Sequence, residues 1–150
     1  MYDYGNDMSI PPIPRFDGVA AAFMGFTDET QDMQNWVYDL LRVNIMAVSY
    51  SDRALEWLTK SAIPLDFVIV DVEHLGGVHK ALNFCLEIRK ALPAMKIILI
   101  SDEVGGDDFG SERKPVCDGT LMKPISQTRL LDAILICSQK QSSRAVIEYA

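Results

Sequence analysis

The sequence has few cysteines, a deficit of positive charge and no long apolar run. Its three cysteines, at positions 85, 117 and 137, form no C-x-x-C pair or zinc-ligand grouping, which favours reduced thiols. Fourteen basic against twenty-one acidic residues give a net charge of -7, which disfavours non-specific binding to nucleic acid or anionic membranes. The longest apolar run, 19–26, is far short of the roughly 20 residues that span a bilayer.

The amino terminus also lacks the features of a signal peptide. Residues 1–17 have no basic start followed by an apolar stretch, and their prolines and acidic side chains predict a flexible leader. We therefore expect a cytoplasmic protein. A length of 150 residues, 49% of them hydrophobic, suits one folded domain. We expect this domain to span 18–140, followed by a tail or helix extension at 141–150.

After the leader, short apolar runs alternate with stretches of helical period, a pattern typical of a parallel sheet covered by helices. The connection at 104–117 is interrupted by glycines and a proline, so we expect its crossover helix to be degenerate or absent. The sequence thus predicts a doubly wound α/β fold. Strands are predicted at 19–26, 44–49, 67–70, 96–100 and 119–122, and helices at 30–42, 52–61, 78–92 and 126–139.

Polar side chains follow the predicted strands at the points where they end. Asp28 and Glu29 follow the first strand, Asp71 the third, Ser101 the fourth and Lys123 the fifth. Because ligands of open parallel sheets bind outside the carboxyl ends of the strands, we expect these side chains to converge. Taken singly, each has a simpler role open to it as a turn, cap or solvated residue.

This set of groups suits phosphoryl chemistry. Crowded carboxylates need a cation to neutralise them, and Mg²⁺ accepts a few oxygen ligands alongside water, so we expect a magnesium site. Beside such an ion Asp71 is our candidate nucleophile for a phosphoryl group. The new phosphoryl oxygens then require a point charge and a hydroxyl donor, which Lys123 and Ser101 supply.

The ordered set of motifs resembles that of response-regulator receiver domains, over about residues 18–140. The residues that carry the resemblance are the pair Asp28-Glu29, the runs from Asp66 to Asp71 and from Ile98 to Ser101, and the run from Gly119 to Pro124. The spacings agree as well: 30 residues separate positions 71 and 101, and 22 separate positions 101 and 123.

The resemblance implies a flavodoxin-like sheet of order 2-1-3-4-5 and a role for each strand-end residue. It implies that Asp71 is the phosphoacceptor, with Ser101 the switch hydroxyl and Lys123 the phosphate-binding lysine. It assigns Mg²⁺ to Asp28, Glu29 and Asp71 and to the backbone carbonyl of Glu73. It further implies a histidine kinase or phosphotransfer protein as donor, output by contact with a downstream protein, and no catalysis beyond the domain's own phosphorylation and dephosphorylation.

Two alternatives stay open. One is a pseudo-receiver that acts as an interaction scaffold without phosphorylation, motivated by Asp102 beside Ser101, by Thr120 in the fifth strand and by the glycine-rich 104–117 segment. The other is a metal-dependent phosphohydrolase or nucleotide-binding enzyme. It is disfavoured because no glycine-rich phosphate loop follows the first strand and no separate general acid is found.

Overall fold

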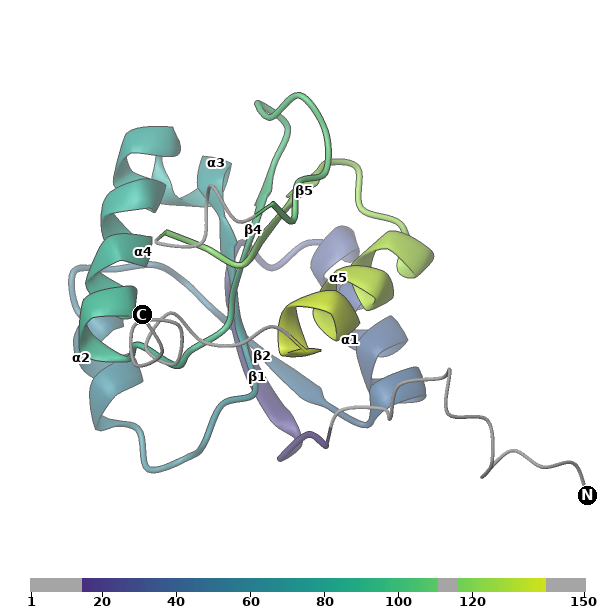
Figure 1. Cartoon of the computed structure of the whole chain (residues 1–150), viewed down its shortest axis with the longest axis horizontal. Coiled ribbons are helices and arrows are strands. Elements are labelled where there is room, and N and C mark those ends of the chain that lie inside the picture. Colours follow the sequence, from purple (N-terminus) through teal and green to yellow (C-terminus); the bar gives the residue numbers. More distant parts are fainter. Residues whose placement is uncertain (1–14, 111–115, 140–150) are drawn as a thin grey trace, which may run out of the picture.

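The computed structural model describes residues 15–110 and 116–139, which form a central sheet with helices on both faces (Figure 1). The predictions for 1–14 and 140–150 lie outside the described residues. Among those described, no helix is long and apolar enough to cross a membrane. The strands are β1 (Val19–Phe23), β2 (Asn44–Val48), β3 (Val68–Asp71), β4 (Ile97–Ser101) and β5 (Gly119–Met122), and the helices are α1 (Asp28–Leu41), α2 (Ala54–Lys60), α3 (Val72–Leu75), α4 (Val78–Ala91) and α5 (Gln127–Gln139).

All the strand pairs within the sheet are parallel, and the order β2-β1-β3-β4-β5 confirms the predicted topology. Strand β3 lies in the middle and is buried along its whole length, as expected of an apolar strand with helices on both sides. Asp71 pairs in register with Ile100, and Ser101 with Met122, so the carboxyl ends of β3, β4 and β5 lie at one edge of the sheet.

Two apolar clusters hold the helices to the sheet, one on each face. Successive side chains of a strand point to opposite faces, so Ile69 belongs to one cluster while Val68 and Val70 belong to the other. Helices α1 and α5 cover the first face, and α2 and α4 cover the second (Figure 1). Buried apolar side chains of these helices, such as Val37 of α1 and Cys85 of α4, form this packing.

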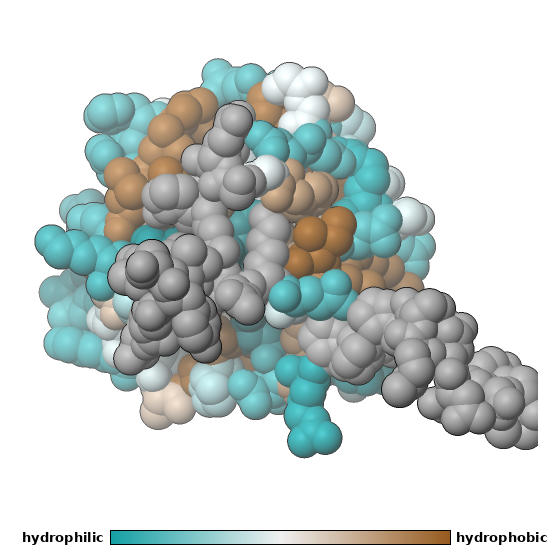
Figure 2. All heavy atoms as spheres, viewed as in Figure 1, coloured by the Kyte–Doolittle hydropathy of each residue, from teal (hydrophilic) through white to brown (hydrophobic). Residues whose placement is uncertain are grey.

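The connection from β4 to β5 differs from the other crossovers. Its described parts, 102–110 and 116–118, contain no helix, which confirms the expected loss of a crossover helix. Instead, Asp108 forms an antiparallel bridge with Thr120, and its backbone N–H and carbonyl both pair with that residue. Figure 2 shows hydrophobic surface over α4, where Val78, Leu82 and Leu86 are partly exposed.

Two local differences from the sequence prediction matter for the site. Strand β1 ends at Phe23 instead of residue 26, because Thr27 caps α1 and the Thr30 hydroxyl donates to the Gly25 carbonyl, which turns the backbone out of the sheet. The single turn α3 was not predicted. It forms because the Asp71 carboxylate accepts from the backbone N–H groups that follow it.

The start of the described chain is attached to the domain. Phe16 packs against the first apolar cluster, and the backbone N–H of Asp17 donates to the Asp66 carboxylate over 2.6 Å. The same carboxylate accepts from Gly18 and Val19 and so ties the start of β1 to the segment before β3. Phe16 and Asp17, which were assigned to the leader from the sequence, therefore contact the folded part.

Candidate functional site

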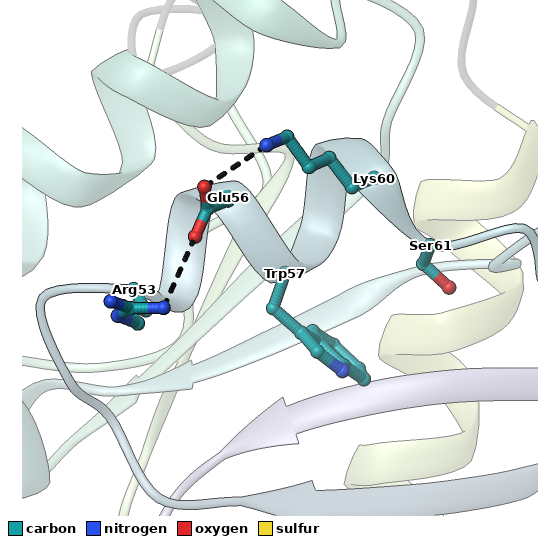
Figure 3. Close-up of a pocket in the computed structure, with 5 residues that line it drawn as sticks. All are labelled: Arg53, Glu56, Trp57, Lys60 and Ser61. Atoms are coloured by element: carbon teal, nitrogen blue, oxygen red, sulfur yellow. Dashed lines mark hydrogen bonds and ion pairs between the residues drawn. The ribbon is translucent and has the colours of Figure 1, made fainter.

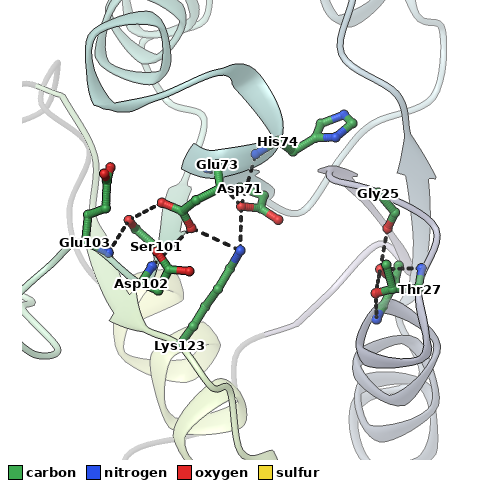
Figure 4. A network of polar contacts seen from close by, with 10 residues as sticks. Gly25, Thr27, Asp71, Glu73, His74, Ser101, Asp102, Glu103 and Lys123 are labelled. Carbon is green, nitrogen blue, oxygen red and sulfur yellow. Dashed lines mark hydrogen bonds and ion pairs between the residues drawn. The ribbon is translucent and has the colours of Figure 1, made fainter.

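Asp71 occupies the end of β3, in the place predicted for it. It is only 7% exposed, and its Oδ1 accepts from the N–H groups of Glu73 and His74 at 3.1 and 3.4 Å. The same oxygen lies 2.8 Å from the Lys123 Nζ, which reaches it from the end of β5 (Figure 4). The expected meeting of this carboxylate and this amine is confirmed.

The Lys123 ammonium contacts a second carboxylate, that of Glu73, at 3.1 Å. Partial burial lowers the pKa of Lys123, but the hydrogen bonds and charges of Asp71 and Glu73 outweigh it, so the pKa of this amine lies above its usual range. The amine is therefore positively charged at neutral pH and is the cation that balances these two acids.

Ser101 is fully buried at the end of β4 and is held by two hydrogen bonds. Its hydroxyl donates to Glu73 Oε2 over 2.6 Å and accepts from the backbone N–H of Glu103 over 3.0 Å. The structure therefore brings Ser101, like Lys123, into one polar cluster with Asp71 and Glu73, as predicted, and this cluster is called the pocket below. The link between them is the side chain of Glu73.

Sequence reasoning missed this role of the Glu73 side chain, because only its backbone carbonyl was assigned to the site. Its Oε1 accepts from the Asp102 N–H at 3.0 Å as well as from Lys123. Burial raises the pKa of the Glu73 carboxyl, but hydrogen bonds from Ser101, Asp102 and Lys123 lower it by more. The pKa therefore lies below its usual range. An acidic residue two positions after Asp71 was the available signal.

Asp28 and Glu29 are not brought to this pocket. They lie in the first turn of α1, where Asp28 is exposed and their charges favour the positive end of the helix. Phe23 pairs with Val70, so the positions level with the end of β3 belong to Met24 and Gly25. Within residues 15–110 and 116–139 no three His, Cys, Asp or Glu side chains are grouped to hold a metal ion.

Comparison with known proteins gives matches at the level of structure. No protein-family model and no curated protein matches the sequence. A receiver protein from Sinorhizobium medicae matches with a TM-score of 0.60 at 19% identity, over 81% of this chain and 94% of its own. A response regulator from Thermotoga maritima matches with a TM-score of 0.57 at 20% identity, over 82% and 98% of the two chains. A receiver domain from Clostridium thermocellum gives 0.56 at 19%, over 87% and 98%.

The chain has the receiver fold. The likeness covers most of this chain and nearly all of each of these receivers, and it agrees with the sheet order β2-β1-β3-β4-β5. At these identities the shared feature is the fold itself, so the chemistry has to be argued from the side chains of this chain.

The residues of this receiver fold do not fit a Mg²⁺ ion at the positions expected from the sequence. A methionine and a glycine stand at the end of β1, and neither side chain supplies an oxygen ligand. Asp71 and Glu73 are both paired with Lys123, which already balances much of their charge. We therefore derive no chemical step through a metal ion.

His74, which follows Glu73 in α3, has a structural role. Its Nε2 accepts from the backbone N–H of Tyr50 at 3.0 Å, which requires the unprotonated form of that nitrogen. The ring thereby links the turn after β3 to the loop after β2. The ring also lies near the end of β1, since a β-carbon on Gly25 would be 4.0 Å from its Nδ1.

A concave region lies on α2, and none of the residues around Asp71 lines it. Figure 3 shows Glu56 between Arg53 and Lys60 on the surface, with Trp57 turned toward the sheet. The two cations are 87% and 74% exposed, and ion pairs so open to water contribute little energy. This region offers no converging polar groups comparable to those around Asp71.

Proposed function

We propose that this chain is a receiver-fold signalling module that works through protein contact and does not depend on metal-assisted phosphorylation of Asp71. The observation that carries the proposal is the end of β1, where Met24 and Gly25 stand level with Asp71 and the acids expected there lie in α1 instead. The likeness to solved receivers supports the signalling role, and the acidic composition supports a cytoplasmic protein partner over nucleic acid.

The electrostatics of the pocket support the same proposal. Asp71, Glu73 and Lys123 together leave one net negative charge beside the carboxylate that would have to attack a phosphoryl group. An incoming phosphodonor is itself anionic, and without a divalent ion its charge is not offset. Transfer to Asp71 is therefore expected to be slow or absent.

The test is to incubate the full chain with Mg²⁺ and acetyl phosphate and to follow its intact mass. We expect no phosphoryl adduct on the wild-type chain and no difference from Asp71→Asn. As a matched positive control, Gly25→Asp places an oxygen ligand at the end of β1, where a β-carbon has no neighbour closer than 3.9 Å. A wild-type adduct that disappears in Asp71→Asn would overturn the proposal.

A second candidate function is phosphoryl acceptance at Asp71 from a histidine kinase or phosphotransfer protein, with Mg²⁺ bound on a rearranged site. It is favoured by one observation, the 2.8 Å contact between Lys123 and Asp71. The same mass measurement separates the two candidates, because only this one expects the adduct. In both, the output is a contact with a downstream protein.

A further inference from the structure

Three hydrogen-bond donors converge on the Glu73 carboxylate from outside its own turn. They are the Ser101 hydroxyl at 2.6 Å, the Asp102 backbone N–H at 3.0 Å and the Lys123 ammonium at 3.1 Å (Figure 4). One comes from the end of β4, one from the residue after it and one from just beyond β5. A hydroxyl, an amide and an ammonium aimed at one point form a binding site for an oxyanion.

The carboxylate uses both of its oxygens in this pocket. Oε2 accepts from Ser101, and Oε1 accepts from Asp102 and Lys123. A free oxyanion such as phosphate is likewise an acceptor, and its oxygens can replace both of these at the same donors. The Ser101 hydroxyl is fully buried and donates to a charged carboxylate. A water molecule in place of that carboxylate would leave the hydroxyl without a charged partner.

We propose that Glu73 is a built-in occupant of an oxyanion pocket, and that this pocket accepts phosphate once the side chain is removed. The inference rests on the proposed function, in which Asp71 is not phosphorylated. The anion that the donors bind is then supplied by the chain itself and not by a phosphodonor. It assigns to Glu73 the place that an external anion would take between Ser101 and Lys123, and so makes the side chain a regulator of the site.

Occupation from within also fixes the neighbouring loop. Through Glu73 the turn after β3 is bound to Ser101, to Asp102 and to Lys123, and the Ser101 hydroxyl in turn accepts from the Glu103 N–H. The first residues of the β4–β5 connection are thus pinned in one conformation. A partner that binds this loop therefore contacts the same surface whether or not a phosphodonor is present.

Charge predicts an order of phosphate affinities. Among the three ion-paired side chains Asp71, Glu73 and Lys123, the wild type has one net negative charge, Glu73→Ala is neutral, and Asp71→Asn combined with Glu73→Ala is positive by one, with Asp102 and Glu103 unchanged throughout. We expect phosphate to bind Glu73→Ala at least about tenfold more tightly than the wild type, and the double variant more tightly again. Adding Lys123→Ala to Glu73→Ala removes the cation and is expected to abolish binding.

The experiment is a titration of the full-length chain with inorganic phosphate, followed through the backbone amide resonances of Asp102 and Glu103. Potassium chloride at matched ionic strength is the control for unspecific salt effects. A saturable shift in Glu73→Ala whose midpoint lies at a phosphate concentration at least about tenfold below that of the wild type, and which is missing from the double variant with Lys123→Ala, supports the proposal. Equal responses in wild type and Glu73→Ala, or no response in either, overturn it.

The dispersion of the amide spectrum reports whether each variant is folded. Should Glu73→Ala lose its fold, Glu73→Gln retains the side-chain volume while weakening the contact with Lys123, and we expect it to bind phosphate between wild type and Glu73→Ala. Wild-type behaviour of a folded Glu73→Gln then contradicts the proposal. No phosphodonor is present, so this result is independent of the adduct test of the proposed function.

Discussion

At the scale of single residues, the site depends on how one acidic side chain is held. Glu73 accepts hydrogen bonds from three groups, and these lower the pKa of its carboxyl although burial raises it. A carboxyl whose pKa is lower in the folded state stabilises the fold above its unfolded pKa. This stabilisation is lost as the pH falls through the folded value.

The first prediction follows from that sign. The free energy of unfolding of the wild type should exceed that of Glu73→Gln at neutral pH, and the difference should shrink as the pH falls below the ordinary value of 4.5. Urea unfolding of both proteins at several values between pH 7 and pH 3 measures it. A difference that stays constant with pH would show that the charge of Glu73 is not the stabilising feature.

At this scale, the sequence predicted the position of a residue correctly where the path of the backbone alone determines it. Asp71, Ser101 and Lys123 were found because each ends a strand, and strand ends meet at one edge of a parallel sheet. The position of Glu73 was missed because side-chain direction in a single helical turn depends on the cap that Asp71 provides, not on any period. The acidic pair was misplaced because apolar residues 24–26 extended the predicted strand past its true end.

At the scale of elements, the described part of the connection from β4 to β5 packs closely against β5. Gly119 opens β5, and a β-carbon there would lie 2.6 Å from Cδ1 of Phe109 and 2.9 Å from the Cys137 Sγ. Real β-carbons do not approach other atoms this closely, so either the loop or α5 has to shift. The glycine is therefore required for the loop to lie against the strand.

We accordingly expect Gly119→Ala to destabilise the fold by about 1–3 kcal/mol, the usual cost of overpacking. Gly105→Ala is the matched control, since nothing lies within 4 Å of its β-carbon, and it should change stability by less than about 0.5 kcal/mol. Chemical denaturation of the two variants measures both values. Combining Gly119→Ala with Phe109→Leu should recover part of the loss, and equal effects of the two alanines would contradict this account of the packing.

Among the elements, periodicity located the four longer helices and all the strands, with ends displaced by a few residues at most. It did not reveal α3, because four residues are too few to show a period and its cause is the capping of backbone N–H groups by Asp71. Interrupted periodicity did predict that 102–110 and 116–118, the described parts of the connection from β4 to β5, contain no helix. Glycine and proline disfavour a helix through the backbone, which makes such a forecast independent of tertiary packing.

At the scale of the whole molecule, the two apolar clusters lie on opposite faces of the same sheet and contain side chains of the same strands. Trp36 packs against the apolar cluster under α1 and α5, while Trp57 packs against the other cluster and meets Phe23 edge-on, with ring centroids 6.1 Å apart. Because the same buried strands form the floor of both clusters, loss of one cluster exposes the other. The domain should therefore unfold as one unit.

The two tryptophans allow this to be tested one face at a time. In Trp36→Phe the fluorescence reports on the α2 side, and in Trp57→Phe it reports on the α1 side. We expect each variant to show the same denaturation midpoint by fluorescence as by far-ultraviolet circular dichroism. Separate midpoints within one variant would indicate that the two layers come apart independently.

The bridge between Asp108 and Thr120 has a consequence for assembly. An open sheet has two borders, and the unpaired backbone groups along a border invite a strand from another molecule. On the β5 border that position is already taken by Asp108, whereas β2 pairs only with β1 among the described strands. The β2 border is therefore the side of the sheet that is more open to a strand from another molecule.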